Sequence, residues 1–305
     1  MSVTSWLRFR QRVEVFPEKR IRNRALLTAA SSVLLSIPFI ITGKGLIIFL
    51  PLIAGAGILY FFIYIQKFAR RERIAKKGLA ESIKRILMEK VSFYKNLSSR
   101  DKIDYESNIA IFLSEHSIDG VDGIEITDEV KALVAASAVR LTFRRPGWEY
   151  HNFGEILIYP GGFSPEGNYS TKSQSGFSAA GMVHSQGGVI LSLPHLLNSF
   201  AHDNDGFNVG YHEFAHVLDG RRPDGTPDEL NLGSYRPWAQ AMQSEFEKVH
   251  SHRSVLRDYA GTSPAEFFAC SVEYFFEKPE KMKARAPEVY RQLSTFFDQD
   301  PAAGR

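Results

Sequence analysis

The stretch VGYHEFAHVLDG, residues 209–220, holds two histidines four residues apart, with a glutamate directly after the first. On an α-helix, His212 and His216 lie on the same side, one turn apart. That spacing lets both imidazoles reach one Zn²⁺ at ~2.0–2.1 Å. Glu213 is offset around the helix, so it can reach a water beside the metal without ligating it. The stretch therefore predicts a zinc peptidase helix with Glu213 as general base. The alternative is a buried helix whose histidines are only hydrogen-bonded.

A catalytic zinc has three protein ligands and one open position, so a third ligand must come from elsewhere. The extended metzincin pattern needs glycine at position 219 and histidine at position 222, where this chain has Asp219 and Arg222. That class is excluded. The best remaining segment is YAGTSPAEFFACSVEYFF, residues 259–276, whose glutamates Glu266 and Glu273 are seven apart and share a helix face.

The residues around Glu266 leave two interpretations open. Ser263, Pro264, Ala265 and Glu266 fit the first positions of a helix with a capping box. On local grounds Glu266 is as suited to capping the helix as to binding metal. If it caps, Glu273 becomes the candidate ligand.

The apolar segments LLTAASSVLLSIPFIIT (26–42) and LIIFLPLIAGAGILYFFIYI (46–65) are separated only by GKG. The second is long enough to cross a hydrocarbon core of ~30 Å, and the first is near the lower limit. Both flanks are basic, which favours a membrane over nucleic acid as partner and places both flanks in the cytoplasm. We expect a transmembrane helical hairpin. The competing interpretations are a signal peptide, a single span with the first segment in the interface, and two core helices of a soluble domain.

The composition is that of a folded protein, with 305 residues, 44% hydrophobic and 23% charged residues, and a net charge of +3. The single cysteine, Cys270, excludes an internal disulfide and fits a reducing compartment. The expected organisation is a basic cytoplasmic N-terminus (1–25), the hairpin (26–65), a basic juxtamembrane helix (66–84) and a metallopeptidase domain (85–300).

The soluble part is expected to be α+β, one mostly helical domain with a small sheet. A basic amphipathic helix should run from about Lys67 to Tyr105, with a break near LSSRDK. Thr127 should cap a later helix. Short strands are expected at 154–163 and 187–193, and helices at 194–201, 207–220, 236–250, 264–277 and 286–298. Residues 221–237 should form a loop.

HEFAHVLD followed by YAGTSPAEFFACSVEYFF resembles the Mlc titration factor A family of zinc peptidases, which is related to the catalytic domain of anthrax lethal factor. The resemblance covers roughly residues 85–300, including GIEITDEVKALVAASAVRL, EILIYPGGF and DGTPDEL. It implies a zincin-like (gluzincin) fold, Glu266 as the third zinc ligand and Tyr259 as a catalytic residue. A phenol at Tyr259 could donate to the oxyanion, although half-buried packing is the alternative.

Ligating histidines usually donate their other N–H to an acceptor, and Asp219 and Glu273 are the candidates for that support. For Asp219 the alternative is hydrogen bonding at the end of its helix. Substrate could bind as an extended strand along a sheet edge, for which 187–193 is the candidate. Its apolar character fits a core strand equally well.

These observations predict a multi-pass inner-membrane Zn²⁺ metallopeptidase that faces the cytoplasm and cuts a peptide or protein substrate. The second hypothesis is a regulatory binding protein. The resemblance implies a cytoplasmic partner, a transcriptional repressor of sugar uptake, with peptidase activity secondary.

Overall fold

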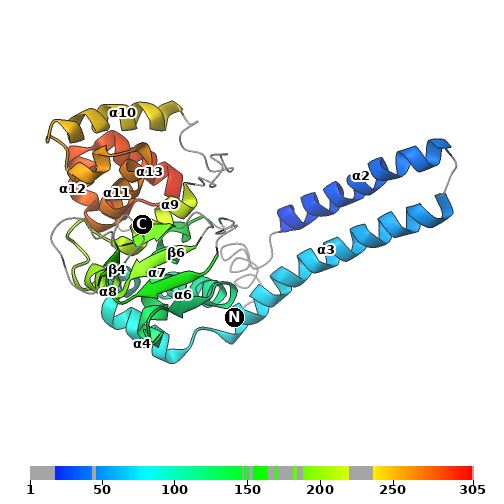
Figure 1. Cartoon of the computed structure of the whole chain (residues 1–305), viewed down its shortest axis with the longest axis horizontal. Helices are drawn as coiled ribbons and strands as arrows, with labels where there is room; N and C mark the ends of the chain where they lie inside the picture. The colour runs from blue at the N-terminus through cyan, green and yellow to red at the C-terminus, as the bar shows by residue number, and fades with distance from the viewer. Residues whose placement is uncertain are drawn as a thin grey trace. The chain divides into compact units, whose positions relative to one another are not determined.

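The computed structural model describes residues 18–42, 46–145, 148, 150, 154–163, 169–170, 181–183, 188–219 and 236–303 (Figure 1). The chain divides into two compact units, Met1–Gly78 and Leu79–Arg305. Most of the expected basic N-terminus and the expected turn at residues 43–45 lie outside the described residues.

The first unit contains two long helices, α2 (Glu18–Thr42) and α3 (Leu46–Lys77), which lie side by side (Figure 1). They meet closely at Gly57, where an added Cβ would lie 2.8 Å from Ser32 Oγ. Among the described residues, one stretch, Leu52–Lys77, is long and apolar enough to cross a membrane. The apolar part of α2, Ala25–Ile37, is shorter.

The large apolar side chains of this unit point outward. Leu34 is 65% exposed and Ile58 is 71% exposed, and only 6% of the apolar window of α3 is buried. A core helix of a soluble protein shows the opposite pattern, because its apolar face is covered by its own fold.

The prediction of one helix from Lys67 to Tyr105 with a single break was wrong, because this segment is interrupted more than once. α3 ends at Lys77, and α4 (Glu81–Lys90), α5 (Ser92–Asn96) and α6 (Ser99–Glu115) follow. Gly78 ends α3 because its φ of +78° lies in the left-handed region, where glycine is favoured. Val91 has extended backbone between α4 and α5. The predicted break near LSSRDK is confirmed, with Ser98 capping α6.

Helix α7 (Asp128–Thr142) lies at the centre of the second unit. The predicted cap is confirmed, because Thr127 Oγ1 accepts a hydrogen bond from the Val130 N–H at 3.3 Å. Four of its buried residues are alanines, which lets other helices approach its backbone: Ala132, Ala135, Ala136 and Ala138. Helices α4, α6, α8 and α9 all contact it.

The main sheet has the order β1-β2-β6-β5, formed by Ile118–Gly120, Ile156–Tyr159, Val189–Ser192 and Gly181–Val183. β1, β2 and β6 are parallel, and β5 is antiparallel to β6. The predicted strand at 154–163 is divided into β2 and β3 (Gly162–Phe163), and β3 pairs with β4 (Tyr169–Ser170).

The predicted edge strand was wrong. Residues 187–193 contain β6, which pairs with β2 on one side and β5 on the other, and all four of its residues are buried. Its continuous apolar run is therefore that of a central strand, buried on both faces. On this side of the sheet the outermost described strand is β5.

The C-terminal half is helical, and the predictions for 194–201, 236–250, 264–277 and 286–298 are confirmed to within a residue or two. The described residue ranges are α8 (Leu193–Ala201), α9 (Val209–Leu218), α10 (Arg236–His250), η2 (Asp258–Gly261), α11 (Pro264–Glu277), α12 (Pro279–Arg285), α13 (Pro287–Phe297) and η3 (Pro301–Ala303). Gly220, the expected end of α9, and residues 221–235 lie outside the described residues, while 236–237, expected as loop, begin α10. α9 lies between the sheet and α11 (Figure 1).

We predict that the crossing of α7 and α9 requires glycine at position 210. A Cβ there would lie 2.1 Å from Ser137 Oγ and 2.6 Å from Ser137 Cβ. Gly210→Ala should therefore destabilise the full chain by about 1–3 kcal/mol, the usual cost of overpacking. Ser137→Gly should cost about 1 kcal/mol, as glycine does inside a helix. Denaturant unfolding in detergent should show that the double variant loses less stability than the two single variants lose together. Additive losses would contradict a contact between positions 137 and 210.

Candidate metal centre

Two capped helices position the site. The buried Asn208 caps α9, its Oδ1 accepting from the Tyr211 N–H at 3.0 Å. Ser263 caps α11, its Oγ accepting from the Glu266 N–H at 3.1 Å. Only this half of the predicted capping box is formed by the contacts described, because the Glu266 carboxylate is directed at α9. Capping and a role in the site therefore use different atoms of Glu266.

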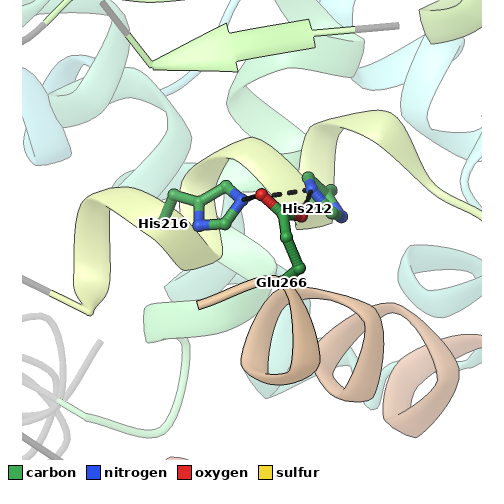
Figure 2. Close-up of side chains that lie close together, drawn as sticks. All are labelled: His212, His216 and Glu266. Atoms are coloured by element: carbon green, nitrogen blue, oxygen red, sulfur yellow. Dashed lines mark hydrogen bonds and ion pairs between the residues drawn. The ribbon is translucent and has the colours of Figure 1, made fainter. Parts of the chain in front are cut away.

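Three side chains converge between α9 and α11 (Figure 2). His212 Nε2 lies 3.1 Å from His216 Nε2 and 3.0 Å from Glu266 Oε2, and His216 Nε2 lies 3.4 Å from Glu266 Oε1. Nitrogen and oxygen ligands at ~2.0–2.1 Å from a tetrahedral zinc are about 3.3 Å apart. The three side chains thus fit one metal ion in the separations of their nitrogen and oxygen atoms as well as in the chemical types of those atoms.

The hydrogen bonding of His212 shows why a cation suits this position. His212 Nδ1 lies 2.7 Å from Glu273 Oε1, so Nδ1 carries the proton that the carboxylate accepts. Neutral His212 then presents the lone pair of Nε2 to Glu266 Oε2, a second acceptor. That oxygen is buried and has no hydrogen-bond donor among the described residues. A metal ion, or a proton on His212, resolves the repulsion between the two acceptors.

The pKa shifts follow from this arrangement. Burial alone lowers the pKa of His212, but its contacts with Cys270, Glu266 and Glu273 raise it well above the usual value. Burial alone raises the pKa of Glu266, but its contacts with His212 and His216 lower it below the usual range. Glu266 is therefore ionised at neutral pH, which is the state in which a carboxylate binds metal.

Glu213 is buried between α9 and the edge strand β5. A Cβ on Gly181 of β5 would lie 2.5 Å from Glu213 Cγ and 2.6 Å from its Oε1, so glycine leaves the room that this side chain occupies. Burial raises the pKa of Glu213, while His212 and His216 act in the opposite direction. A raised pKa suits a group that must both take and return a proton near neutral pH.

Tyr259 lies on η2, beside the convergent side chains. Its ring centroid is 6.2 Å from that of His212, and the residue is 50% exposed. Burial of part of the ring and the nearby Glu266 carboxylate raise the pKa of Tyr259, which keeps its hydroxyl a donor. The exposure places it where a substrate can reach it.

Glu273 is fully buried and holds three partners. Besides His212, its Oε1 accepts from Arg257 at 2.7 Å, and its Oε2 accepts from the Asn208 N–H at 2.8 Å. Arg257 Nε also donates to Cys270 Sγ at 3.3 Å. The sequence made Glu273 a candidate for supporting a histidine, and the structure places it against both His212 and Arg257.

Asn208 and Arg257 were missed in the sequence. Asn208 had a usable signal, because asparagine just before an apolar helical pattern is a preferred N-cap. Arg257 had no such signal, since it lies in a segment without periodicity.

Asp219 caps the C-terminal end of α9, where its N–H donates to the Ala215 carbonyl at 2.8 Å. Its support of a histidine stays a prediction.

Comparisons with known proteins match a region that begins within the last part of α3 and includes nearly all of the second unit. The family model of the glucose-regulated metallo-peptidase M90 matches residues 65–298. An uncharacterised protein of Synechocystis is 28% identical over 245 residues, covering 76% of this chain and 89% of that protein. Mlc titration factor A of Serratia proteamaculans is 31% identical over 236 residues, covering 68% and 84%. That of Klebsiella pneumoniae is 31% identical over 232 residues, covering 69% and 83%.

The two uses of Glu266 can be separated by substitution. Ser263→Ala removes the cap and should cost about 1 kcal/mol of stability while the purified full chain keeps its bound metal. Glu266→Ala should leave the cap in place, since the cap uses the Glu266 N–H, and should lose the metal. Metal content by mass spectrometry and unfolding midpoints measure both. Metal retained in Glu266→Ala would exclude this residue as a ligand and leave Glu273 as the candidate.

Proposed function

Because this chain belongs to the M90 family of glucose-regulated metallopeptidases, we propose that it is a zinc-dependent peptidase. The observation that carries the proposal is the convergence of His212 Nε2, His216 Nε2 and Glu266 at separations of 3.0–3.4 Å, with Glu266 Oε2 lacking any described hydrogen-bond donor. These three residues are the proposed zinc ligands. A zinc ion held there would supply Lewis acidity, which polarises a peptide carbonyl and makes a water more acidic.

Glu213 is the proposed general base. Its carboxylate takes a proton from the attacking water and returns it to the leaving amine. The position next to His212 on α9 and the space provided by Gly181 support this role. Tyr259 is proposed to donate its hydroxyl hydrogen bond to the oxyanion, which its raised pKa and its exposure support.

Glu273 and Asp219 are proposed to support the ligands. Glu273 accepts the Nδ1 proton of His212, which fixes the ring and leaves Nε2 as the metal-binding atom. Arg257 donates a hydrogen bond to Glu273 Oε1 and so holds that carboxylate in place. Asp219 is assigned the same kind of role beside His216, one turn along α9.

A substrate peptide is proposed to bind as an extended strand against β5. Among the described strands, β5 pairs on one side only, and it lies against α9 beside Glu213. Backbone hydrogen bonds along such an edge bind a peptide independently of its sequence. The mostly helical unit with its small mixed sheet would then be a zincin-like fold.

The membrane anchor is proposed to be the helical hairpin α2–α3. The outward-facing apolar side chains and the apolar stretch Leu52–Lys77 support it, and the family match begins only at residue 65. Basic residues in the C-terminal part of α3 favour the cytoplasmic side for the peptidase unit: Lys67, Arg70, Arg71, Arg73, Lys76 and Lys77. This gives a multi-pass inner-membrane protein.

A second candidate function is capture of a cytoplasmic regulator. The name Mlc titration factor A, carried by relatives 30–36% identical to this chain, describes a protein that titrates another. In this case binding would be the main function and peptide hydrolysis secondary.

Glu213→Gln separates the two functions. The substitution keeps the shape of the side chain and removes the base, so peptide hydrolysis should fall at least ~100-fold while bound zinc is retained. Hydrolysis of a fluorogenic peptide library and metal analysis measure this, with Glu247→Gln on α10 as a matched glutamine substitution away from the site. A cellular phenotype that survives Glu213→Gln would identify binding as the main function.

The hairpin predicts that the turn between the helices faces away from the cytoplasm. In intact cells a membrane-impermeant maleimide should label Lys44→Cys and leave Lys77→Cys unlabelled. The native Cys270 is buried, so the protein without an added cysteine is the control for background labelling. Labelling of both positions, or of neither while lysed cells react at both, would show that α3 does not cross the membrane and would overturn the hairpin.

A further inference from the structure

A cavity of about 220 Å³ lies beside the N-terminal end of α9, and none of the three proposed ligands lines it. Its volume is about that of seven water molecules, enough for a small organic molecule. Its polar lining includes Arg140, Asp203, Asn208, Tyr211 and Glu277. The apolar lining includes Val91, Leu97, Phe200, Pro279 and Pro301.

Glu277 is the unusual member of this lining. It is 5% exposed, at the C-terminal end of α11. Its Oε1 accepts from Asn208 Nδ2 at 3.1 Å, which holds the carboxyl group in place. Its Oε2 is buried and has no hydrogen-bond partner among the described residues. A buried ionised carboxylate with an unpaired oxygen is unstable, so either a proton or a cation must compensate it.

The surrounding charges do not supply that cation. Burial raises the pKa of Glu277 to about 8; the Asn208 hydrogen bond opposes this shift, and the nearby Asp205, Asp203 and Glu273 carboxylates add to it. The local excess of acid therefore attracts positive charge into the cavity.

Arg140 is the cation that lines the cavity, and it is held by other groups. Its guanidinium carbon lies 3.6 Å from the ring centroid of Phe93 and 4.2 Å from that of Phe276. It also hydrogen-bonds to Gln299. The guanidinium is stacked between two aromatic faces, and cation–π attraction to these rings stabilises its charge. Among the described residues, no ion pair joins it to Glu277.

We propose that this cavity binds a small organic ammonium ion. The positive group of the ligand lies beside the Glu277 carboxyl group, Asp203 adds attraction at the same end, and the carbon chain lies against Phe200 and the adjoining apolar lining. A hydrated divalent metal fits less well, since it needs six or more oxygen ligands and apolar side chains form about half of the lining.

The ligand would contact a hydrogen-bonded chain that reaches the metal centre. Asn208, which binds Glu277, donates its N–H to Glu273 Oε2 at 2.8 Å, and Glu273 Oε1 lies 2.7 Å from His212 Nδ1. Binding itself does not depend on the proposed peptidase activity, so each can fail without the other.

Calorimetric titration of the detergent-solubilised full chain with n-butylammonium chloride tests the proposal. We expect a dissociation constant of ~0.1–10 mM, appropriate to so few atoms. The affinity should rise about tenfold or more from pH 6.5 to pH 8.5, because the ligand stays charged while the Glu277 carboxyl ionises. Titration with n-butanol should show no binding. Equal binding of n-butanol, or of Mg²⁺ in place of the amine, would overturn the proposal.

Substitutions assign the effect to the cavity. Glu277→Gln keeps the acceptor for Asn208 and should weaken amine binding at least about tenfold, as loss of a buried charged hydrogen bond does. Asp203→Asn, in the turn after α8, should weaken it a few-fold. Glu280→Gln, an exposed glutamate three residues after Glu277, should leave it unchanged. If Glu277→Gln folds with an unchanged unfolding midpoint and binds like Glu280→Gln, the proposal is wrong. If Glu277→Gln unfolds, the Asp203→Asn variant decides instead. Amine binding by Asp203→Asn that is as strong as in the unsubstituted chain would also show that the proposal is wrong.

Discussion

The hydrogen bond from His212 Nδ1 to Glu273 Oε1 is the interaction on which the arrangement of the metal centre depends. It joins α9 to α11 at the point where both are buried, and it decides which imidazole nitrogen faces Glu266. Glu273 also accepts hydrogen bonds from Arg257 and from the Asn208 N–H, so both of its carboxylate oxygens have protein donors. These donors hold the Glu273 carboxylate in place, and it can therefore orient His212.

The backbone packing beneath that bond allows it to form. α9 approaches α7 closely at Gly210, and the alanines of α7 let several helices approach its axis. On its other side α9 lies against β5, where Gly181 leaves space for Glu213. Small residues at these two contacts set the position of α9, and the placement of the candidate ligand side chains depends on that position.

The errors of the sequence analysis have a common physical origin. A continuous apolar run such as 187–193 shows that a strand is buried, but its neighbours in the sheet depend on segments elsewhere in the chain. The long basic segment after Lys67 was assigned too few breaks, because charge and amphipathicity continue across Gly78 and Val91 while the backbone does not. The cap at Thr127 was predictable, since it involves residues three apart.

The sequence by itself determined what acts over a few residues: the paired histidines with their glutamate, the caps at Thr127 and Ser263, and the two apolar segments. These follow from helix periodicity and length alone. Only the tertiary structure decided that the Glu266 carboxylate faces the histidines while its N–H is capped, and that Arg257 and Asn208 hold Glu273. Those contacts join residues up to 65 positions apart, and their formation depends on how α9 and α11 pack.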